Sequence, residues 1–177
     1  MTTKSFLIGC SLVALSAAGA WAEGSSQRGW AEIKDASGKT VGAAVLTEQK
    51  DGVLVNLKVS GLKPGLHAFH VHETGDCTGP DFKSAGGHFN PFHKHHGMKN
   101  PEGKHAGDMP NLEVQPDGSA RASVLAEGTT LGPGPGSLLK PGGTALVIHA
   151  SPDDNLSDPA GNAGARVACG VIRAKAE

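Results

Sequence analysis

Turn-forming residues divide this chain into short segments, and this pattern restricts the folds that it can adopt. Among 177 residues there are 26 glycines and 11 prolines, and helical periodicity is scarce. Turns rich in Gly, Pro, Asp and Ser separate the apolar segments at residues 35–38, 51–52, 62–65, 116–118 and 141–143. Short strands joined by such turns are typical of an antiparallel sandwich or barrel, so we predict an all-β protein.

Strand-like patterns occur in six segments, at residues 30–34, 53–59, 69–72, 120–125, 145–149 and 168–172. In the second of these the odd positions are apolar, whereas Asn56 and Lys58 are polar. This alternation predicts one face in the core and one in water. The strand pattern disappears between residues 71 and 113, and a second irregular stretch covers residues 151–166. Loops of this length are usually functional or disordered, and the histidines in the first one favour function.

The first residues have the features of a secretory signal peptide. Lys4 gives a basic start, residues 6–18 are apolar and small, and Ala20-Trp21-Ala22 is a typical cleavage sequence. The apolar run is too short to span a bilayer as a helix of the mature protein. We therefore predict a signal peptide over residues 1–22 and one domain over residues 23–177.

Three cysteines bear on export and folding. Attachment of a lipid at Cys10 is an alternative to simple cleavage, but the apolar stretch before this residue is short for a signal peptide. Cleavage would leave Cys77 and Cys169, and in an oxidising compartment one disulfide between them is the natural interpretation. Ligation of zinc by thiolates is the alternative, although two isolated cysteines lack the paired spacing of zinc sites.

The formal net charge of the whole chain is −1. Non-specific binding of nucleic acid requires a basic surface, so this charge balance argues against a nucleic-acid partner. The cluster His93-Lys94-His95-His96 is too short to change that conclusion.

Nine histidines are the main indication of chemistry. His70 and His72 lie two residues apart in a predicted strand, so both side chains leave the same face, and His149 ends another strand and could complete their site. His105 and Asp108, with other loop histidines, offer nitrogen and oxygen ligands for a tetrahedral zinc ion. Unrelated surface histidines and a solvated polar loop remain the alternative interpretations.

These motifs together resemble copper/zinc superoxide dismutases. The matching segments are His67-Ala68-Phe69-His70-Val71-His72-Glu73, Gly87-His88-Phe89-Asn90-Pro91, His105-Ala106-Gly107-Asp108, Val147-Ile148-His149 and residues 161–170. The likeness extends over residues 28–173 and keeps the family's order and spacing. It implies an eight-stranded antiparallel Greek-key β-barrel or sandwich with two long functional loops.

The resemblance also implies a role for each site residue. The implied copper ligands are His70, His72, His88 and His149, and the implied zinc ligands are His88, His96, His105 and Asp108. His88 would bridge one copper ion and one zinc ion per chain. Asp153 would join a copper ligand to a zinc ligand, Arg166 would guide the anionic substrate, and Cys77 and Cys169 would form the family's disulfide.

The implied reaction is the dismutation of superoxide to oxygen and hydrogen peroxide. Copper accepts an electron from one superoxide and returns it to a second, and imidazole ligands suit both oxidation states. His88 could release reduced copper, take a proton and pass it to the peroxide. Zinc has no redox role and would order the long loop. Arg166 would supply a permanent positive charge where the anion arrives.

Two regions depart from the familiar cytosolic enzymes, namely the segment from Cys77 to His88 and the loop from His149 to Arg166, which is short and lacks their Lys/Glu-rich segment. Cys77 lies eleven residues before His88, and residues 76–83 are similar to the exported bacterial branch. That likeness implies a periplasmic enzyme, either a homodimer or a monomer, free of the membrane once its signal is cleaved. His93 and His95 have no counterpart among the ligands; a solvated loop is favoured over an auxiliary copper-capture site. His67 is expected to be structural.

Two other functions compete with the enzyme. The first is a non-catalytic copper-binding protein or copper chaperone on the same fold, and the second is a purely structural zinc protein. Relatives of the first kind tend to lose a copper ligand or the guiding arginine, whereas this chain keeps all seven implied ligands and Arg166. The second leaves His70, His72 and His149 without a role.

Overall fold

The computed structural model describes residue 1 and residues 27–175, and its regular structure is almost entirely β. The predicted signal peptide over residues 1–22 lies outside the described residues apart from residue 1. The strands are β1 (Arg28–Asp35), β2 (Thr40–Gln49), β3 (Gly52–Val59), β4 (Gly65–His67), β5 (Phe69–His72), β6 (Leu112–Val114), β7 (Ala120–Glu127), β8 (Ala145–His149), β9 (Arg166–Val171) and β10 (Arg173–Ala174). A 3₁₀ turn, η1 (Lys83–Ala85), accompanies them. Within the described part of the chain, no helix has the length and apolar character needed to cross a bilayer.

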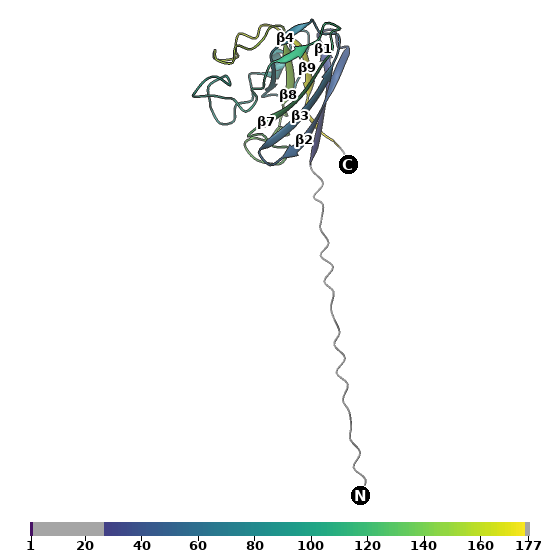
Figure 1. Ribbon diagram of the computed structural model, residues 1–177, viewed down its shortest axis with the longest axis vertical. Helices are drawn as coiled ribbons and strands as arrows, with labels where there is room; N and C mark the ends of the chain where they lie inside the picture. The colour runs from purple at the N-terminus through teal and green to yellow at the C-terminus, as the bar shows by residue number, and fades with distance from the viewer. Residues whose placement is uncertain (2–26, 176–177) are drawn as a thin grey trace.

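Eight strands form one antiparallel sheet, as the family resemblance implied. Seven follow the order β5-β8-β9-β1-β2-β3-β7, with β10 paired to β1, and β4 pairs separately with β6. The sheet curls so that its strands enclose the core, while the irregular segments gather at one side of it (Figure 1). The prediction of an all-β antiparallel barrel or sandwich is confirmed.

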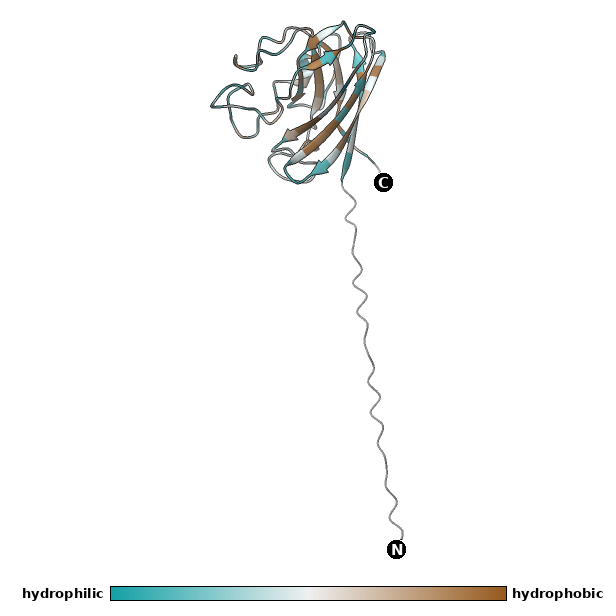
Figure 2. Ribbon diagram, in the orientation of Figure 1, coloured by the Kyte–Doolittle hydropathy of each residue, from teal (hydrophilic) through white to brown (hydrophobic). Residues whose placement is uncertain are grey.

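Alternating residues direct one face of the sheet into the core. In β3, Val55, Leu57 and Val59 are buried, whereas Asn56 and Lys58 between them are exposed. The same alternation of apolar and polar residues is visible along the long strands in Figure 2. Burial of apolar side chains is the main force that closes such a sheet.

All six predicted strands are present, but β2 was missed. Its buried residues Val41, Ala44 and Leu46 are separated by Gly42 and Ala43, so the contrast between apolar and polar positions is weak. Gly42 is required by the pairing itself, because a Cβ there would overlap the backbone of β3. The short strands β4, β6 and β10 were also missed.

The long irregular stretch is attached to the free edge of β5. The amide of Val71 donates to Gly107 O at 2.9 Å, and the amide of Phe89 donates to Val71 O at 2.9 Å. The amide of Glu73 similarly donates to Gly87 O at 2.9 Å. In the resulting antiparallel β-bridges, His72 lies opposite His88 and His70 lies opposite Asp108. The loop therefore delivers its candidate ligands directly beside those of the strand.

Candidate metal centre

Four histidines come together at the end of the barrel, and we call them the four-histidine group: His70, His72, His88 and His149. Two belong to β5, one ends β8, and His88 comes from the loop paired to β5. One ring nitrogen of each lies within 4.8 Å of the others, and all four side chains are buried. The predicted site is therefore assembled as expected from strand alternation and from the resemblance.

The outward-facing nitrogens of these rings are occupied by the protein. His70 Nε2 donates to Asp153 Oδ2 at 2.6 Å, His72 Nδ1 donates to Gly86 O at 3.0 Å, and His149 Nδ1 lies 3.3 Å from Gly164 O. Such contacts fix both the tautomer and the orientation of a metal-binding imidazole. They leave the inner nitrogens available to a ligand.

Two inner nitrogens are buried and unpartnered among the described residues, namely His70 Nδ1 and His88 Nε2. Buried polar atoms almost always have a hydrogen-bonding partner, so two such atoms facing one space require an explanation. His72 Nε2 and His149 Nε2 complete the set, 3.3 Å apart. Four imidazole nitrogens around one space fit a copper ion.

A second group contains three histidines and a carboxylate, and we call it the His₃Asp group: His88, His96, His105 and Asp108. The Nδ1 atoms of His88, His96 and His105 lie 2.9, 3.1 and 3.2 Å from Asp108 Oδ1. Ligands about 2.0 Å from a tetrahedral zinc ion are about 3.3 Å apart. The group is therefore already close to the size that zinc requires.

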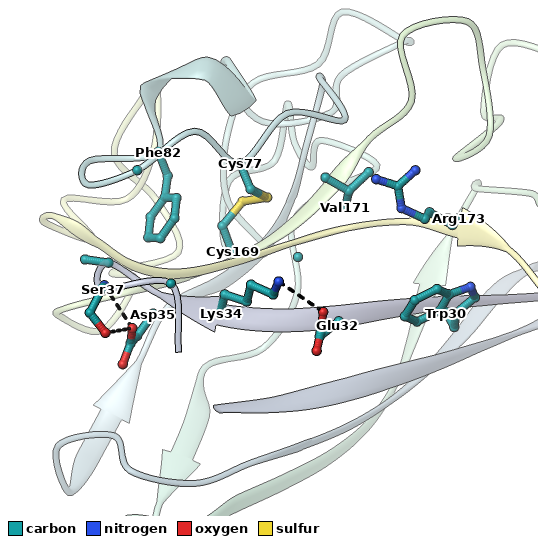
Figure 3. Close-up of a pocket in the computed structure, with 14 residues that line it drawn as sticks. Trp30, Glu32, Lys34, Asp35, Ser37, Cys77, Phe82, Cys169, Val171 and Arg173 are labelled. Carbon is teal, nitrogen blue, oxygen red and sulfur yellow. Dashed lines mark hydrogen bonds and ion pairs between the residues drawn. A yellow bond between two sulfur atoms is a disulfide. The ribbon is translucent and has the colours of Figure 1, made fainter. Parts of the chain in front are cut away.

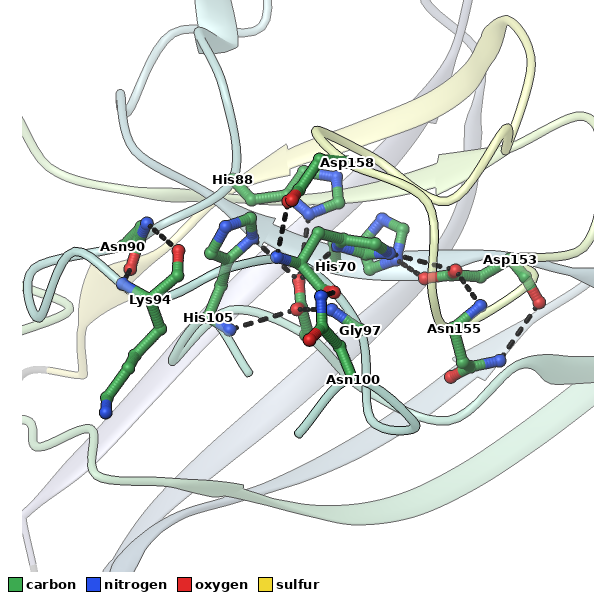
Figure 4. Close-up of polar contacts among 12 residues, drawn as sticks. His70, His88, Asn90, Lys94, Gly97, Asn100, His105, Asp153, Asn155 and Asp158 are labelled. Atoms are coloured by element: carbon green, nitrogen blue, oxygen red, sulfur yellow. Dashed lines mark hydrogen bonds and ion pairs between the residues drawn. The ribbon is translucent and has the colours of Figure 1, made fainter. Parts of the chain in front are cut away.

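Asp153 connects the two groups. Its Oδ2 accepts from His70 Nε2 at 2.6 Å (Figure 4), and its Oδ1 accepts from His96 Nε2 at 3.0 Å. Asn111 Oδ1 accepts from the Asp153 amide at 2.8 Å and holds the carboxylate in place. Gly161 packs against the same carboxylate, and a Cβ at this position would overlap it.

The burial of the site controls its protonation. Burial lowers the pKa of His72 to about 2, that of His149 to about 3 and that of His88 to about 4. Burial opposes the charge on His96, but hydrogen bonds to Asp108 and to the Asp153 carboxylate raise its pKa to about 9. His72, His88 and His149 therefore favour the neutral imidazoles that bind metals.

A cleft of about 490 Å³ leads to the four-histidine group. His72, His88 and His149 line it together with Arg166. The guanidinium of Arg166 is half-buried and donates to Phe82 O and Gly86 O, both at 2.6 Å. The arginine therefore presents a fixed positive charge in the cleft that the imidazoles also line.

Cys77 and Cys169 form the predicted disulfide, so the thiolate-zinc alternative is wrong. The bond joins the loop before η1 to strand β9 across 92 residues, and Phe82 packs in the same small cluster (Figure 3). Phe82 also provides a carbonyl to Arg166. The disulfide therefore ties the segment that holds the arginine to the barrel.

The remaining histidines differ in their surroundings. His67 is buried, with one ring nitrogen 2.7 Å from His149 O and the other 2.8 Å from Lys63 O, which confirms a structural role. The structure places His96, not His93 or His95, in the His₃Asp group. His95 Nδ1 instead donates to Asp158 Oδ2 at 2.6 Å.

Several supporting groups were not predicted. The carbonyls of Gly86 and Gly164 orient two imidazoles, and backbone carbonyls carry no signature in a sequence. Asp158 also accepts from the His96 amide at 2.7 Å and joins the second irregular stretch to the first. An aspartate in a polar loop gave no sign of this role.

Comparisons with known proteins agree with this geometry. The family model "Copper/zinc superoxide dismutase (SODC)" matches residues 40–172. "Superoxide dismutase [Cu-Zn] 2" of Aquifex aeolicus (strain VF5) is 56% identical over 145 residues, covering 81% of this chain and 85% of the relative. "Superoxide dismutase [Cu-Zn]" of Caulobacter vibrioides (strain ATCC 19089 / CIP 103742 / CB 15) is 46% identical over 146 residues, covering 81% and 84%. The crystal structure of a SOD-like protein from Bacillus subtilis has a TM-score of 0.78 at 40% identity and covers 80% of this chain and 96% of that one.

Proposed function

Because the chain belongs to the copper/zinc superoxide dismutase family, we propose a division of labour among its site residues. The protein converts superoxide to oxygen and hydrogen peroxide, with one copper and one zinc ion as cofactors. When bound, copper supplies the one-electron chemistry and zinc supplies only charge and structure. The other contributions come from the chain itself.

The four-histidine group holds copper and the His₃Asp group holds zinc. The inner nitrogens of His70, His72, His88 and His149 are the copper donors. His88 belongs to both groups, since its Nδ1 faces Asp108 and its Nε2 faces the other three imidazoles. The observation that carries this assignment is the pair of buried, unpartnered nitrogens, His70 Nδ1 and His88 Nε2.

Arg166 binds and orients the substrate. Superoxide is a small anion, and a guanidinium remains charged at any physiological pH. Two hydrogen bonds to carbonyls fix the Arg166 side chain, so it needs no rearrangement when the anion arrives. A preorganised charge of this kind is more effective than a mobile one.

His88 transfers a proton to the peroxide product. His88 lines the cleft, and its Nε2 is buried and has no hydrogen-bonding partner among the described residues. Asp108 contacts the other ring nitrogen at 2.9 Å and keeps the ring in place. Whenever it is not donating to copper, His88 Nε2 would be able to take a proton from water and pass it to the peroxide, while the Asp108 contact keeps the ring in place.

The disulfide and the bacterial relatives favour an exported protein. The finer location is the periplasm, with residues 1–22 as the cleaved signal and residues 23–177 as the mature domain, either monomeric or homodimeric and free of the membrane. N-terminal sequencing of the periplasmic fraction tests the boundary, and analytical ultracentrifugation tests the oligomeric state. Mature protein that begins elsewhere would overturn the boundary.

The deciding experiment is metal analysis combined with a superoxide dismutation assay on the purified mature protein. We expect one copper and one zinc ion per chain together with rapid dismutation. A copper-binding or copper-chaperone protein on the same fold would bind metal without turnover. Metal-loaded protein without activity would therefore contradict the catalytic roles of His88 and Arg166 and support that alternative.

A further inference from the structure

One imidazole in the cleft belongs to neither ligand group. His93 lines the cleft together with His72, His88 and His149, yet it is exposed to solvent. Its ring forms no hydrogen bond with the described residues. By contrast, the nearby His95 is held by Asp158 at 2.6 Å. His93 is therefore a free nitrogen donor at the entrance to the copper position.

The backbone around His93 is held in one conformation. Its φ is +52°, in the left-handed region that residues other than glycine seldom adopt. Asn90 closes this turn, because its Oδ1 accepts from the Lys94 amide at 2.9 Å and its Nδ2 donates to Lys94 O at 2.8 Å (Figure 4). An uncommon backbone conformation maintained by side-chain bonds is a feature of functional sites.

The histidines of the proposed copper site are almost completely buried. The exposed fractions of His70, His72, His88 and His149 are 0%, 1%, 7% and 4%. A hydrated copper ion must exchange its water ligands for these buried nitrogens. A donor at the entrance that binds the ion first raises its effective concentration near the buried ligands. Imidazole is a suitable ligand for that step.

We propose that His93 is the entry ligand for copper. Its imidazole binds the incoming ion at the mouth of the cleft and releases it by ligand exchange to His72 and His149. This inference rests on the proposed function, in which the four-histidine group is the copper site. His93 takes part in loading and does not belong to the final ligand set.

The test compares the rate of copper uptake by zinc-loaded, copper-depleted mature protein. Cu(II)–glycine is mixed with the wild type, His93→Asn and His95→Asn, and copper absorbance is followed by stopped flow. Asn tolerates the left-handed conformation, so His93→Asn removes the imidazole and keeps the turn. His93→Gly is the second variant if the first fails to fold, as judged by circular dichroism and zinc content.

We expect about tenfold slower uptake in His93→Asn, with His95→Asn equal to the wild type, because only His93 concentrates the ion at the cleft. Copper affinity from chelator competition should agree among the three proteins.

Equal uptake rates would overturn the proposal. A large loss of affinity would place His93 among the final ligands, and slower dismutation per bound copper with normal uptake would assign it to substrate steering; either result contradicts an entry role. Failure of the wild type to bind copper would instead contradict the proposed function.

Discussion

Arg166 and His72 donate to the same carbonyl oxygen, that of Gly86, at 2.6 and 3.0 Å. One peptide group therefore positions both the charge that we propose meets the substrate and a proposed copper ligand. Gly86 directly follows η1, in the segment that the Cys77–Cys169 disulfide ties to the barrel. Substrate guidance and metal geometry are thus coupled through this segment.

Two substitutions of Arg166 should distinguish the effect of its positive charge from the effect of its fixed orientation. Arg166→Ala removes the fixed charge, so we expect kcat/KM to fall about tenfold or more and to depend less on ionic strength. Arg166→Lys keeps the charge without the two-pronged contact to Phe82 and Gly86, so its rate should lie between those of the wild type and Arg166→Ala. Pulse radiolysis at several salt concentrations measures both effects. Loss of copper from Arg166→Ala would contradict a role confined to the substrate.

Removing the disulfide should affect stability and activity together. The double variant Cys77→Ser/Cys169→Ser should lose about 4 kcal/mol of unfolding free energy, since the bond closes a long loop. Its dismutation rate should also fall, because the segment that holds Arg166 is released. Urea unfolding and zinc analysis are the measurements, and zinc binding should persist because neither cysteine contacts the His₃Asp group. Full activity in the double variant would show that the arginine is held without the disulfide.

The carboxylate that joins the two groups should control both metal affinities. Asp153→Asn keeps the size of the side chain but removes its charge, and loss of such a supporting contact lowers metal affinity about 10–100-fold. Asp154→Asn is the matched control, because Asp154 bonds Leu156, Ser157 and Asn162 but no histidine. Chelator competition for copper and for zinc measures the effect. Equal losses in the two variants would indicate a general effect of loop charge.

The packing of Gly161 can be tested separately from its backbone conformation. A Cβ at Gly161 would overlap the Asp153 carboxylate and lie 2.7 Å from His96 Nε2, at a φ of +64°. Gly142 has a φ of +83° and nothing within 4 Å of its Cβ position. Both Gly→Ala variants should lose about 1 kcal/mol or more of stability from the strained backbone. Only Gly161→Ala should also lose metal affinity, measured by zinc and copper analysis after dialysis.

Removing the metals should lower the melting temperature. A ligand at about 100 times its Kd adds about 2.7 kcal/mol of stability, and each 1 kcal/mol shifts the Tm of a chain this size by about 2–4 °C. Extraction of both ions should therefore lower the Tm by about 10 °C or more in differential scanning calorimetry. Adding back zinc alone should restore part of the loss, since it crosslinks the loop residues His96, His105 and Asp108. An unchanged Tm would mean that the ions do not stabilise the fold.

Local sequence patterns predicted the fold where alternation was strong. β3 has a clear period of two, whereas Gly42 and Ala43 conceal the pattern of β2. Strand alternation also predicted that His70 and His72 share one face. It could not decide which of His93, His95 and His96 joins Asp108, because three neighbouring loop histidines have no regular periodicity. The family resemblance favoured His96, and the distance of 3.1 Å from its Nδ1 to Asp108 Oδ1 agrees.

Contacts made by the backbone could not be predicted. The carbonyl of Gly86 depends on the path of the chain between Cys77 and His88, and no residue type specifies that path. The bond from His95 to Asp158 likewise joins residues 63 positions apart in two irregular stretches. Such bonds are visible only after the loops have been placed on the barrel.

Strand β5 is paired on both sides, with β8 at one edge and with residues 87–89 and 107 at the other. Residues 87–89 and residue 107 therefore fix both ends of the segment 90–106 to the sheet, and within residues 90–104 only His96 and Gly97 are buried. For protein engineering this makes the middle of the loop an exchangeable cassette. Its length and charge can be redesigned away from His93, His96 and Gly97, while the residues paired to β5 keep His88 beside the strand histidines.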